Sequence, residues 1–215
     1  MTPHHASEAT LALCQMAPVI PVLVVHDAAH ARPLAQALVA GGLPVLEVTL
    51  RTPAALEVMT EMGHVAGAVV GAGTVLSPAD VRAVKAAGAG FAVSPGATDR
   101  LLAACEDSAL PLLPGAATAT EAMALLERGY TTQKFFPAEV AGGAAALRAL
   151  SSPLPQITFC PTGGIGPGNV ADYLGLPNVV CVGGSWVAPA AMIASGDWDG
   201  ITALARAAAT LPRTT

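Results

Sequence analysis

Residues 44–62 read PVLEVTLRTPAALEVMTEM, and this stretch contains one complete repeating unit of the fold. Its first half, Pro44 to Arg51, is apolar and rich in β-branched residues, which is typical of a strand. Its second half, Pro53 to Met62, has helical periodicity and strong helix formers. Thr52 followed by Pro53 is a capping residue before a proline at the first helical position, so the helix is predicted to begin there.

The same strand–helix unit recurs along the whole chain. Strand-like runs follow one another at intervals of roughly 19 to 25 residues, about the length of one compact βα unit. They start near Val19, Pro44, Ala68, Phe91, Leu110, Thr131, Gln156 and Val179. Helical segments between them include Asp27 to Ala40, Pro78 to Ala87 and Thr120 to Arg128. Ser77 is a predicted N-cap, and Gly41-Gly42, Gly88 and Gly129 are predicted helix ends.

Strict alternation of strands and helices predicts a parallel sheet. Eight short units favour closure into a (β/α)₈ TIM barrel over an open doubly wound sheet. The open sheet is disfavoured because no GxGxxG follows the first strand. A further helix, Ser7 to Gln15, precedes the first strand, and Ile201 to Thr210 is predicted as the last helix. No linker is visible, so residues 1–215 are expected to form one domain.

The composition restricts the classes of function. Of 215 residues, 53% are hydrophobic and only 12% are charged, and the net charge is -5. The low charged fraction suggests that partner subunits cover some apolar surface. The negative charge argues against nucleic acid or an anionic membrane as a partner. We expect a cytoplasmic protein, because no apolar run approaches the ~18 residues of a membrane span and the first residues do not resemble a signal peptide.

The cysteines and histidines do not predict a metal site. The four cysteines form no CxxC and no spaced metal-binding pattern, which is typical of buried thiols in a reducing compartment. They are Cys14, Cys105, Cys160 and Cys181. His26 and His30 are four residues apart, but no third ligand accompanies them.

The sixth predicted strand contains a lysine at an unusual place. It reads TTQKFFP from Thr131 to Pro137. Phe135 and Phe136 lie on opposite faces, so strand alternation alone does not settle where Lys134 points. One interpretation is a surface or ion-paired lysine, since lysine is rarely buried without a partner. The other is a lysine in the mouth of the barrel, where poor solvation favours the neutral, nucleophilic amine.

The second strand gives a clearer alternation. Leu46, Val48 and Leu50 would face the helices, so Glu47 and Arg51 would point into the barrel. A carboxylate beside an amine can transfer protons, directly or through one water. An arginine at the end of a strand can bind a substrate carboxylate with two parallel hydrogen bonds. The alternative is a structural ion pair, which needs no catalytic role.

Small residues gather at the ends of several other strands. The third strand ends in GAGT, and Thr74 could donate a hydrogen bond to a carboxylate. Gly163-Gly164 and Gly183-Gly184 follow the seventh and eighth strands, where barrels usually bind phosphate through backbone N–H groups. Glycine at these positions could instead relieve crowding at the rim.

Seven sequence blocks together resemble one enzyme family. They are LEVTLRTPAA, VGAGTVL, FAVSPG, LPGAATATE, KFFPAE, TFCPTGGI and VGGSWV. They lie between about Val19 and Val187 in the family's order. The chain resembles bacterial 2-keto-3-deoxy-6-phosphogluconate (KDPG) aldolases, also known as 4-hydroxy-2-oxoglutarate (KHG) aldolases, and LEVTLRT with KFFPAE is the most specific part of the match.

The resemblance implies a role for each matching residue. Lys134 would form the Schiff base with the keto carbon, and Glu47 would be the general acid and base. Arg51 and Thr74 would bind the pyruvate carboxylate. The implied residues around the reacting carbon and the pocket wall are Thr162, Pro95 and Phe136. The implied phosphate-binding residues are Gly163, Gly164, Gly184 and Ser185.

The resemblance also implies a class I aldolase that cleaves KDPG to pyruvate and glyceraldehyde 3-phosphate. Such an enzyme would need no metal or other cofactor. It would form a homotrimer and bind a small-molecule substrate. Three alternatives stay open. The enzyme could also cleave 4-hydroxy-2-oxoglutarate to pyruvate and glyoxylate. It could act on the galactonate isomer of the substrate. From a different class, it could be a non-catalytic barrel that senses a phosphorylated metabolite.

Overall fold

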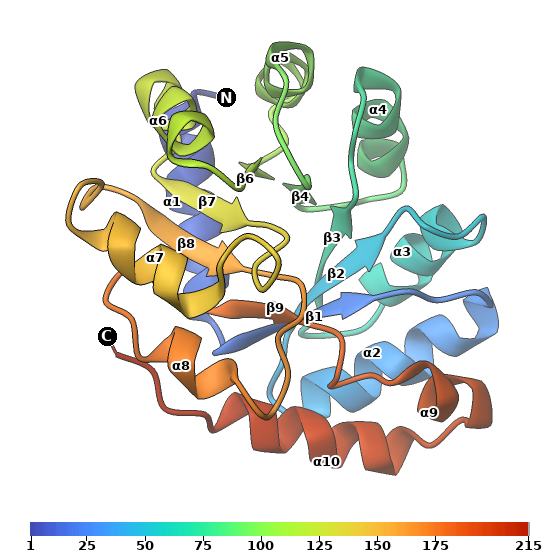
Figure 1. Ribbon diagram of the computed structural model, residues 1–215. Coiled ribbons are helices and arrows are strands. Elements are labelled where there is room, and N and C mark those ends of the chain that lie inside the picture. The colour runs from blue at the N-terminus through green and yellow to red at the C-terminus, as the bar shows by residue number, and fades with distance from the viewer. Residues whose placement is uncertain (215) are drawn as a thin grey trace.

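Residues 1–214 are described by the computed structural model, in which parallel strands alternate with helices. The strands curl around a common interior, and most helices lie outside them (Figure 1). They form a six-stranded sheet in the order β5-β4-β3-β2-β1-β9 and a three-stranded sheet in the order β6-β7-β8. Their bounds are β1 Val19–Leu23, β2 Val45–Thr49, β3 Val69–Gly73, β4 Ala92–Val93, β5 Leu112–Leu113, β6 Gly115–Ala116, β7 Thr132–Phe135, β8 Thr158–Pro161 and β9 Val182–Gly184.

The helices follow the strands as the alternation predicts. Their bounds are α1 Pro3–Gln15, η1 Ala28–His30, α2 Ala31–Ala40, α3 Ala55–Gly63, α4 Pro78–Ala86, α5 Asp99–Asp107, α6 Ala119–Arg128, α7 Gly143–Ser151, α8 Val170–Leu174, α9 Ala190–Ser195 and α10 Trp198–Ala209. The fold is therefore a mixed α/β fold with a curled, half-barrel parallel sheet.

Proline explains why the predicted fifth strand appears as two. Pro114 lies between β5 and β6 and has no N–H to donate to a neighbouring strand. Its carbonyl still accepts a hydrogen bond from the N–H of Lys134, at 2.8 Å. At the other edge of the small sheet, isolated parallel bridges join Phe159 to Val179 and Thr162 to Gly183.

The two faces of β2 separate as the alternation predicts. Leu46 and Val48 pack in the large core cluster with residues of the outer helices, such as Val58 of α3. Val45 belongs to a second, smaller apolar cluster enclosed by the strands. Glu47, on the same face as Val45, is buried. The predicted direction of the β2 side chains is confirmed.

Some of the sequence signals for helix ends predicted the boundaries correctly, and one did not. Ser77 caps α4 by accepting a hydrogen bond from the N–H of Asp80, and Gly129 ends α6 with a φ of 109°. The prediction that Thr52 caps α3 was wrong. Its hydroxyl donates instead to the carbonyl of Val25 at 2.7 Å, and α3 begins later, after Ala54.

The first helix is longer than predicted and covers the amino-terminal end of the strands. Thr2 caps it, so α1 begins at Pro3 rather than at Ser7. The hydroxyl oxygen of Ser7 accepts a hydrogen bond from the N–H of Thr131, at 2.9 Å, and α1 lies against β5 and β7. In Figure 1, α1 passes behind β7 and β8.

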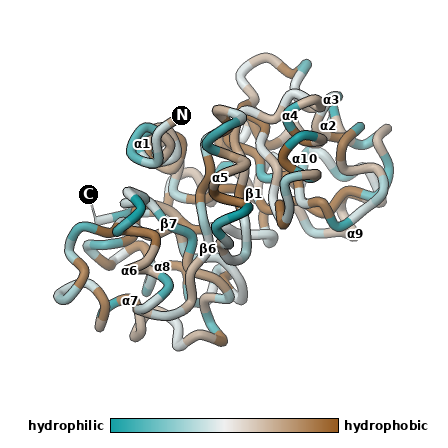
Figure 2. The backbone as a smooth tube through the Cα atoms, turned by 90° about the horizontal axis from the view of Figure 1, so that it is seen from above, coloured by the Kyte–Doolittle hydropathy of each residue, from teal (hydrophilic) through white to brown (hydrophobic). Residues whose placement is uncertain are grey.

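The helices show no long apolar run. Figure 2 shows hydrophilic stretches interrupting the hydrophobic ones along the backbone tube. Among residues 1–214, none of the helices has the length and apolar character needed to cross a membrane.

Candidate active site

Lys134 and Glu47 meet inside the curled sheet. Lys134 projects from β7 and Glu47 from β2, and the Nζ atom lies 3.2 Å from Glu47 Oε1. Both residues are almost inaccessible, with 5% and 3% of their surfaces exposed. Lys134 is also stacked above the ring of Phe136, 5.3 Å from its centroid, where the π-face attracts a cation. The structure therefore places the lysine in the interior, a choice that strand alternation alone did not make.

The position of Glu47 depends on a neighbouring glycine. Gly73 lies opposite Thr49 in the β2–β3 register, and a Cβ there would lie only 2.2 Å from Glu47 Oε1. Any larger residue would force the carboxylate away from Lys134. The small residue at the end of β3 therefore makes room for Glu47.

Arg51 and Thr74 lie just past the carboxyl ends of β2 and β3. Arg51 Nε donates to Thr74 Oγ1 at 3.3 Å. Thr74 has a positive φ of 60°, an uncommon conformation for a β-branched residue that is often associated with functional sites. The pair supplies a cation and a hydroxyl at the edge where ligands bind in this class of fold.

A cavity of about 180 Å³ opens at the same edge, between β1, β7, β8 and β9. It brings together seven of the predicted site residues. They are Arg51, Phe136, Thr162, Gly163, Gly164, Gly184 and Ser185. The cavity therefore joins a guanidinium to two glycine-rich loops that follow neighbouring strands.

The loop after β8 is shaped for close approach to its backbone. Gly163 and Gly164 have φ values of 103° and 78°, which residues with a side chain rarely adopt. Asn169 then fixes the loop, because its side chain accepts from the N–H of Gly166 at 2.8 Å and donates to the carbonyl of Gly164 at 3.0 Å. The sequence analysis did not identify Asn169, although an asparagine just before a helix is a recognisable turn signal.

Thr162 is held beside the cavity by a second glycine. A Cβ at Gly183 would lie 2.3 Å from Thr162 Oγ1, so the glycine leaves space for the hydroxyl. That hydroxyl is buried and has no hydrogen-bond partner among the described residues. A buried polar atom without a partner is costly, and a substrate oxygen or water in the cavity would satisfy it.

Four of the predicted site residues, Lys134, Glu47, Thr74 and Pro95, do not line this cavity. The backbone of Pro95 packs against Gly115, where a Cβ would lie 2.4 Å from it. The predicted contribution of Pro95 to the pocket wall therefore stays a prediction.

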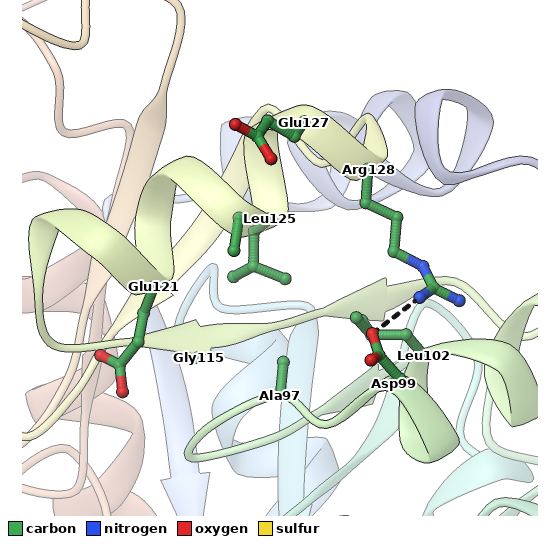
Figure 3. A pocket seen from close by; sticks show the side chains of 9 residues that line it. Ala97, Asp99, Leu102, Gly115, Glu121, Leu125, Glu127 and Arg128 are labelled. Atoms are coloured by element: carbon green, nitrogen blue, oxygen red, sulfur yellow. Dashed lines mark hydrogen bonds and ion pairs between the residues drawn. The ribbon is translucent and has the colours of Figure 1, made fainter.

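A larger cavity of about 410 Å³ lies between α5 and α6, and none of the predicted site residues lines it (Figure 3). Three of its four charged side chains, those of Asp99, Glu121 and Arg128, already have partners. Arg128 bonds to Asp99 at 3.0 Å and to Glu106 at 2.8 Å, while Glu121 caps the start of α6. These groups hold the helices together, so we take the smaller cavity near Lys134 as the candidate active site.

Comparison with known proteins adds independent evidence. The family described as KDPG and KHG aldolase matches residues 11–204. The chain belongs to this aldolase family. A 2-dehydro-3-deoxy-phosphogluconate aldolase of Pseudoalteromonas atlantica is 53% identical over 192 residues, covering 89% of each chain.

Solved structures of the aldolase family share the fold closely. The KDPG aldolase of Zymomonas mobilis ZM4, crystallised with 3-phosphoglycerate, has a TM-score of 0.90 and 50% identity, covering 94% of this chain and 96% of its own. A KDPG aldolase of Legionella pneumophila has the same TM-score of 0.90 with 48% identity, covering 93% of this chain and 98% of its own. The second structure contains pyruvate captured as a covalent carbinolamine intermediate.

Proposed function

We propose that this protein is a class I aldolase that cleaves KDPG to pyruvate and glyceraldehyde 3-phosphate, using Lys134 as the nucleophile. The observation that carries the proposal is the buried Lys134–Glu47 pair, 3.2 Å apart. The Lys134 amine lies over the ring of Phe136, which lines the cavity together with Arg51. A buried amine next to a carboxylate is the arrangement expected for iminium chemistry. The relatives named as KDPG aldolases support the choice of substrate.

The first half of the reaction forms the iminium. The neutral amine of Lys134 adds to the C2 carbonyl of the substrate and gives a carbinolamine. Glu47, which holds the proton that Lys134 gave up, passes it to the hydroxyl of this adduct, so that water leaves and a positively charged iminium remains. That positive charge attracts electrons from the C3–C4 bond. The carbinolamine trapped in the Legionella aldolase is the same type of adduct in a relative.

The second half breaks the carbon–carbon bond. Glu47 takes the proton of the C4 hydroxyl, the C3–C4 electron pair moves to the iminium, and the aldehyde leaves. Glu47 then returns a proton to C3 of the enamine, and water hydrolyses the resulting iminium to release pyruvate. Glu47 can both remove the C4 hydroxyl proton and protonate C3, because its carboxylate lies beside the nitrogen of Lys134. The iminium withdraws the electrons that a metal ion would withdraw in a metal-dependent aldolase, so the mechanism requires no cofactor.

The other residues would hold the two charged ends of the substrate. Arg51 and Thr74 are suited to the carboxylate, since a guanidinium and a hydroxyl can both donate to it. The backbone N–H groups around Gly163, Gly164, Gly184 and Ser185 are suited to the phosphate. Thr162 would lie close to the reacting carbon, and Phe136 and Pro95 would shape the pocket.

We further propose that the two sheets close into one (β/α)₈ barrel and that residues 1–215 form a single domain. Of these residues, Thr215 lies outside the described part of the chain. The bridges from β8 toward β9 support this closure.

A homotrimer in the cytoplasm is also proposed. Its support is the low charged fraction together with exposed apolar side chains such as Leu76 and Val140, which are 58% and 87% exposed. Sedimentation equilibrium would measure the subunit number directly.

The deciding experiment is reductive trapping with pyruvate. Borohydride reduces an iminium to a stable amine, so intact-protein mass followed by peptide mapping would locate the adduct. The assignment is unusually clear because the sequence contains only two lysines, Lys85 and Lys134. Lys85 is exposed on α4 and donates to the carbonyl of Ser108. We expect one pyruvate-sized adduct on the peptide that contains Lys134.

The matched control is a pair of lysine variants. Lys134→Ala should lose both the adduct and turnover, whereas Lys85→Ala should keep both. Appreciable turnover by folded Lys134→Ala would disprove the nucleophile. If wild-type protein is stabilised thermally by KDPG but neither forms an adduct nor turns over, the non-catalytic sensor becomes the better proposal.

Glu47→Gln tests the proton-transfer role separately. We expect kcat to fall by roughly 10²–10⁴-fold, the usual range for general acid–base catalysis, while the pyruvate adduct still forms. An unchanged kcat would point to a different base.

Comparing kcat/KM for KDPG, its galactonate isomer and 4-hydroxy-2-oxoglutarate separates the related activities. The name printed for the matching family supports a test of the third substrate. A higher kcat/KM for the galactonate isomer would overturn the proposed preference.

A further inference from the structure

Three cysteines far apart in the sequence converge inside the curled sheet. Cys14 ends α1, Cys160 lies in β8 and Cys181 directly precedes β9. Their sulfur atoms all lie within 4.8 Å of one another, and Cys160 and Cys181 are 3.5 Å apart. All three are free thiols with at most 2% exposure. The sequence analysis missed this cluster because only the fold brings the three cysteines together.

The cluster is distinct from the candidate active site. Its thiols belong to the small apolar cluster enclosed by the strands, with Ile20, Val45 and Phe91 among its members. The proposed mechanism uses none of the three thiols. Cys160 is the register partner of Lys134 in the neighbouring strand, so the cluster and the candidate active site are neighbours within the curled sheet.

The sulfur separations fit a thiolate metal site. With metal–sulfur bonds of about 2.3 Å, ligand sulfurs lie about 3.8 Å apart in a tetrahedral site and about 4.0 Å apart in a planar three-ligand site. The observed separations come within a small side-chain movement of these values. Soft thiolate ligands select Cu(I) or Zn(II) among common cations.

The number of ligands favours Cu(I) over Zn(II). Structural zinc is almost always bound by four protein ligands. Among residues 1–214 no histidine, aspartate, glutamate or further cysteine joins these three sulfurs as a fourth ligand. Cu(I), in contrast, is satisfied by three sulfurs.

A cavity lies next to residues that adjoin the three cysteines in sequence. It has a volume of about 450 Å³ and lies between α1 and the lower ends of β8 and β9. Gln15, Thr158 and Val180 line it. Gln15 follows Cys14, Val180 precedes Cys181, and Thr158 lies two residues before Cys160 on the same face of β8. A small movement of α1 would connect this cavity to the sulfurs.

We propose that Cys14, Cys160 and Cys181 form a three-thiolate site that binds one Cu(I) ion per chain. Each thiol that becomes a ligand releases its proton to solvent, so binding consumes no oxidant or reductant. The site is assigned to Cu(I) itself, supplied by a low-affinity complex or a copper-carrying protein.

The test is an anaerobic titration of the full-length protein with Cu(I) against a chromogenic Cu(I) chelator. Native mass spectrometry gives the number of ions bound, and X-ray absorption gives the ligand atoms. We expect one ion with a shell of three sulfurs. Cys14→Ser and Cys181→Ser should each weaken binding by more than about 100-fold, beyond the 10–100-fold typical of outer-shell changes. Circular dichroism would show that both variants are folded.

Two controls make the result specific. Cys105→Ser removes a buried cysteine outside the cluster and should leave binding unchanged. His4→Ala with His5→Ala removes the exposed histidines of α1, which are competing copper ligands, and should also leave it unchanged. Loss of binding in the histidine variant, a shell containing nitrogen, or no uptake by fully reduced wild type would overturn the proposal. So would a Cys160–Cys181 disulfide in place of uptake.

Discussion

Gly73 and Gly183 each leave space that a candidate site residue occupies. A Cβ at Gly73 would collide with the carboxylate of Glu47, and one at Gly183 would collide with the hydroxyl of Thr162. The proposed mechanism gives neither glycine a role in the chemistry, and Gly73 does not line the cavity. They act by allowing their neighbours to lie where the chemistry would need them.

Gly73→Ala should therefore lower kcat sharply. A displacement of Glu47 by about 1 Å can cost roughly 100-fold in rate, while the fold should lose only about 1–3 kcal/mol from overpacking. Gly63→Ala is the matched control, because a Cβ at Gly63 would have no atom within 4 Å. Steady-state kinetics and urea unfolding of both variants would check this. Equal kcat in the two variants would show that Glu47 tolerates the methyl group.

Single residues also show how far the sequence alone could be interpreted. The direction of Glu47 followed from the alternation of β2, because every second residue there is apolar. The direction of Lys134 did not, because phenylalanines on both faces of its strand remove the contrast. Asn169 and the three clustered cysteines depend on contacts between distant segments, which no local pattern contains.

At the scale of helices, a group of charged side chains fastens α5 to α6. Arg128 at the end of α6 bonds to Glu106 and Asp99 of α5, and Tyr130 also donates to Glu106. The hydrogen bond from Arg128 holds the pKa of Glu106 below its usual value of 4.5. A carboxylate with a lowered pKa in the folded state stabilises the fold at neutral pH.

Arg128→Met should lower the free energy of unfolding by about 1–2 kcal/mol at pH 7, allowing for partial solvent screening. The difference from wild type should shrink as the pH falls below about 4.5, because Glu106 becomes protonated and the Arg128 bond then stabilises less. Arg206→Met, at an exposed site on α10, is the control and should change stability little. Chemical unfolding at several pH values measures both, and a difference that persists at low pH would exclude Glu106 as the source.

Element boundaries were predicted well where a local signal had no competitor. Ser77 and Gly129 acted as their sequences predicted. Thr52 did not cap α3, because the carbonyl of Val25 on the neighbouring strand end accepts its hydroxyl proton instead. Pro114 split the predicted fifth strand because proline cannot donate to the ladder. At Thr52, a hydrogen bond to a neighbouring element took the place of the predicted helix cap. At Pro114, the missing backbone N–H interrupted the predicted strand.

At the scale of the whole molecule, early and late segments of the chain depend on each other. Ser7 of α1 bonds to Thr131, 124 residues later in the chain. Val19 of β1 pairs with Val182 of β9. The repeated unit predicted this general arrangement, since parallel βα units place successive strands side by side. It did not predict where α1 docks, because no neighbouring repeat specifies that contact.

Chains stalled on the ribosome before β7 emerges should leave α1 open to protease, and complete chains should protect it. Ser7→Ala should weaken that protection in the released protein, because it removes the acceptor for the Thr131 N–H. Pulse proteolysis with an N-terminal label would measure both. Protection of α1 in the shorter stalled chains would mean that the helix docks on an earlier segment.

During synthesis, α1 must wait for a partner that is translated much later, and long-range contacts of this kind form slowly. A waiting helix with a leucine-rich inner face would be a target for aggregation or for chaperones. The face that α1 later buries consists instead of Ala6, Ser7, Thr10 and Cys14, which are small residues, two of them with hydroxyls. The helix α1 can therefore stay exposed on the growing chain until β7 has been translated, because its inner face offers little apolar surface for aggregation.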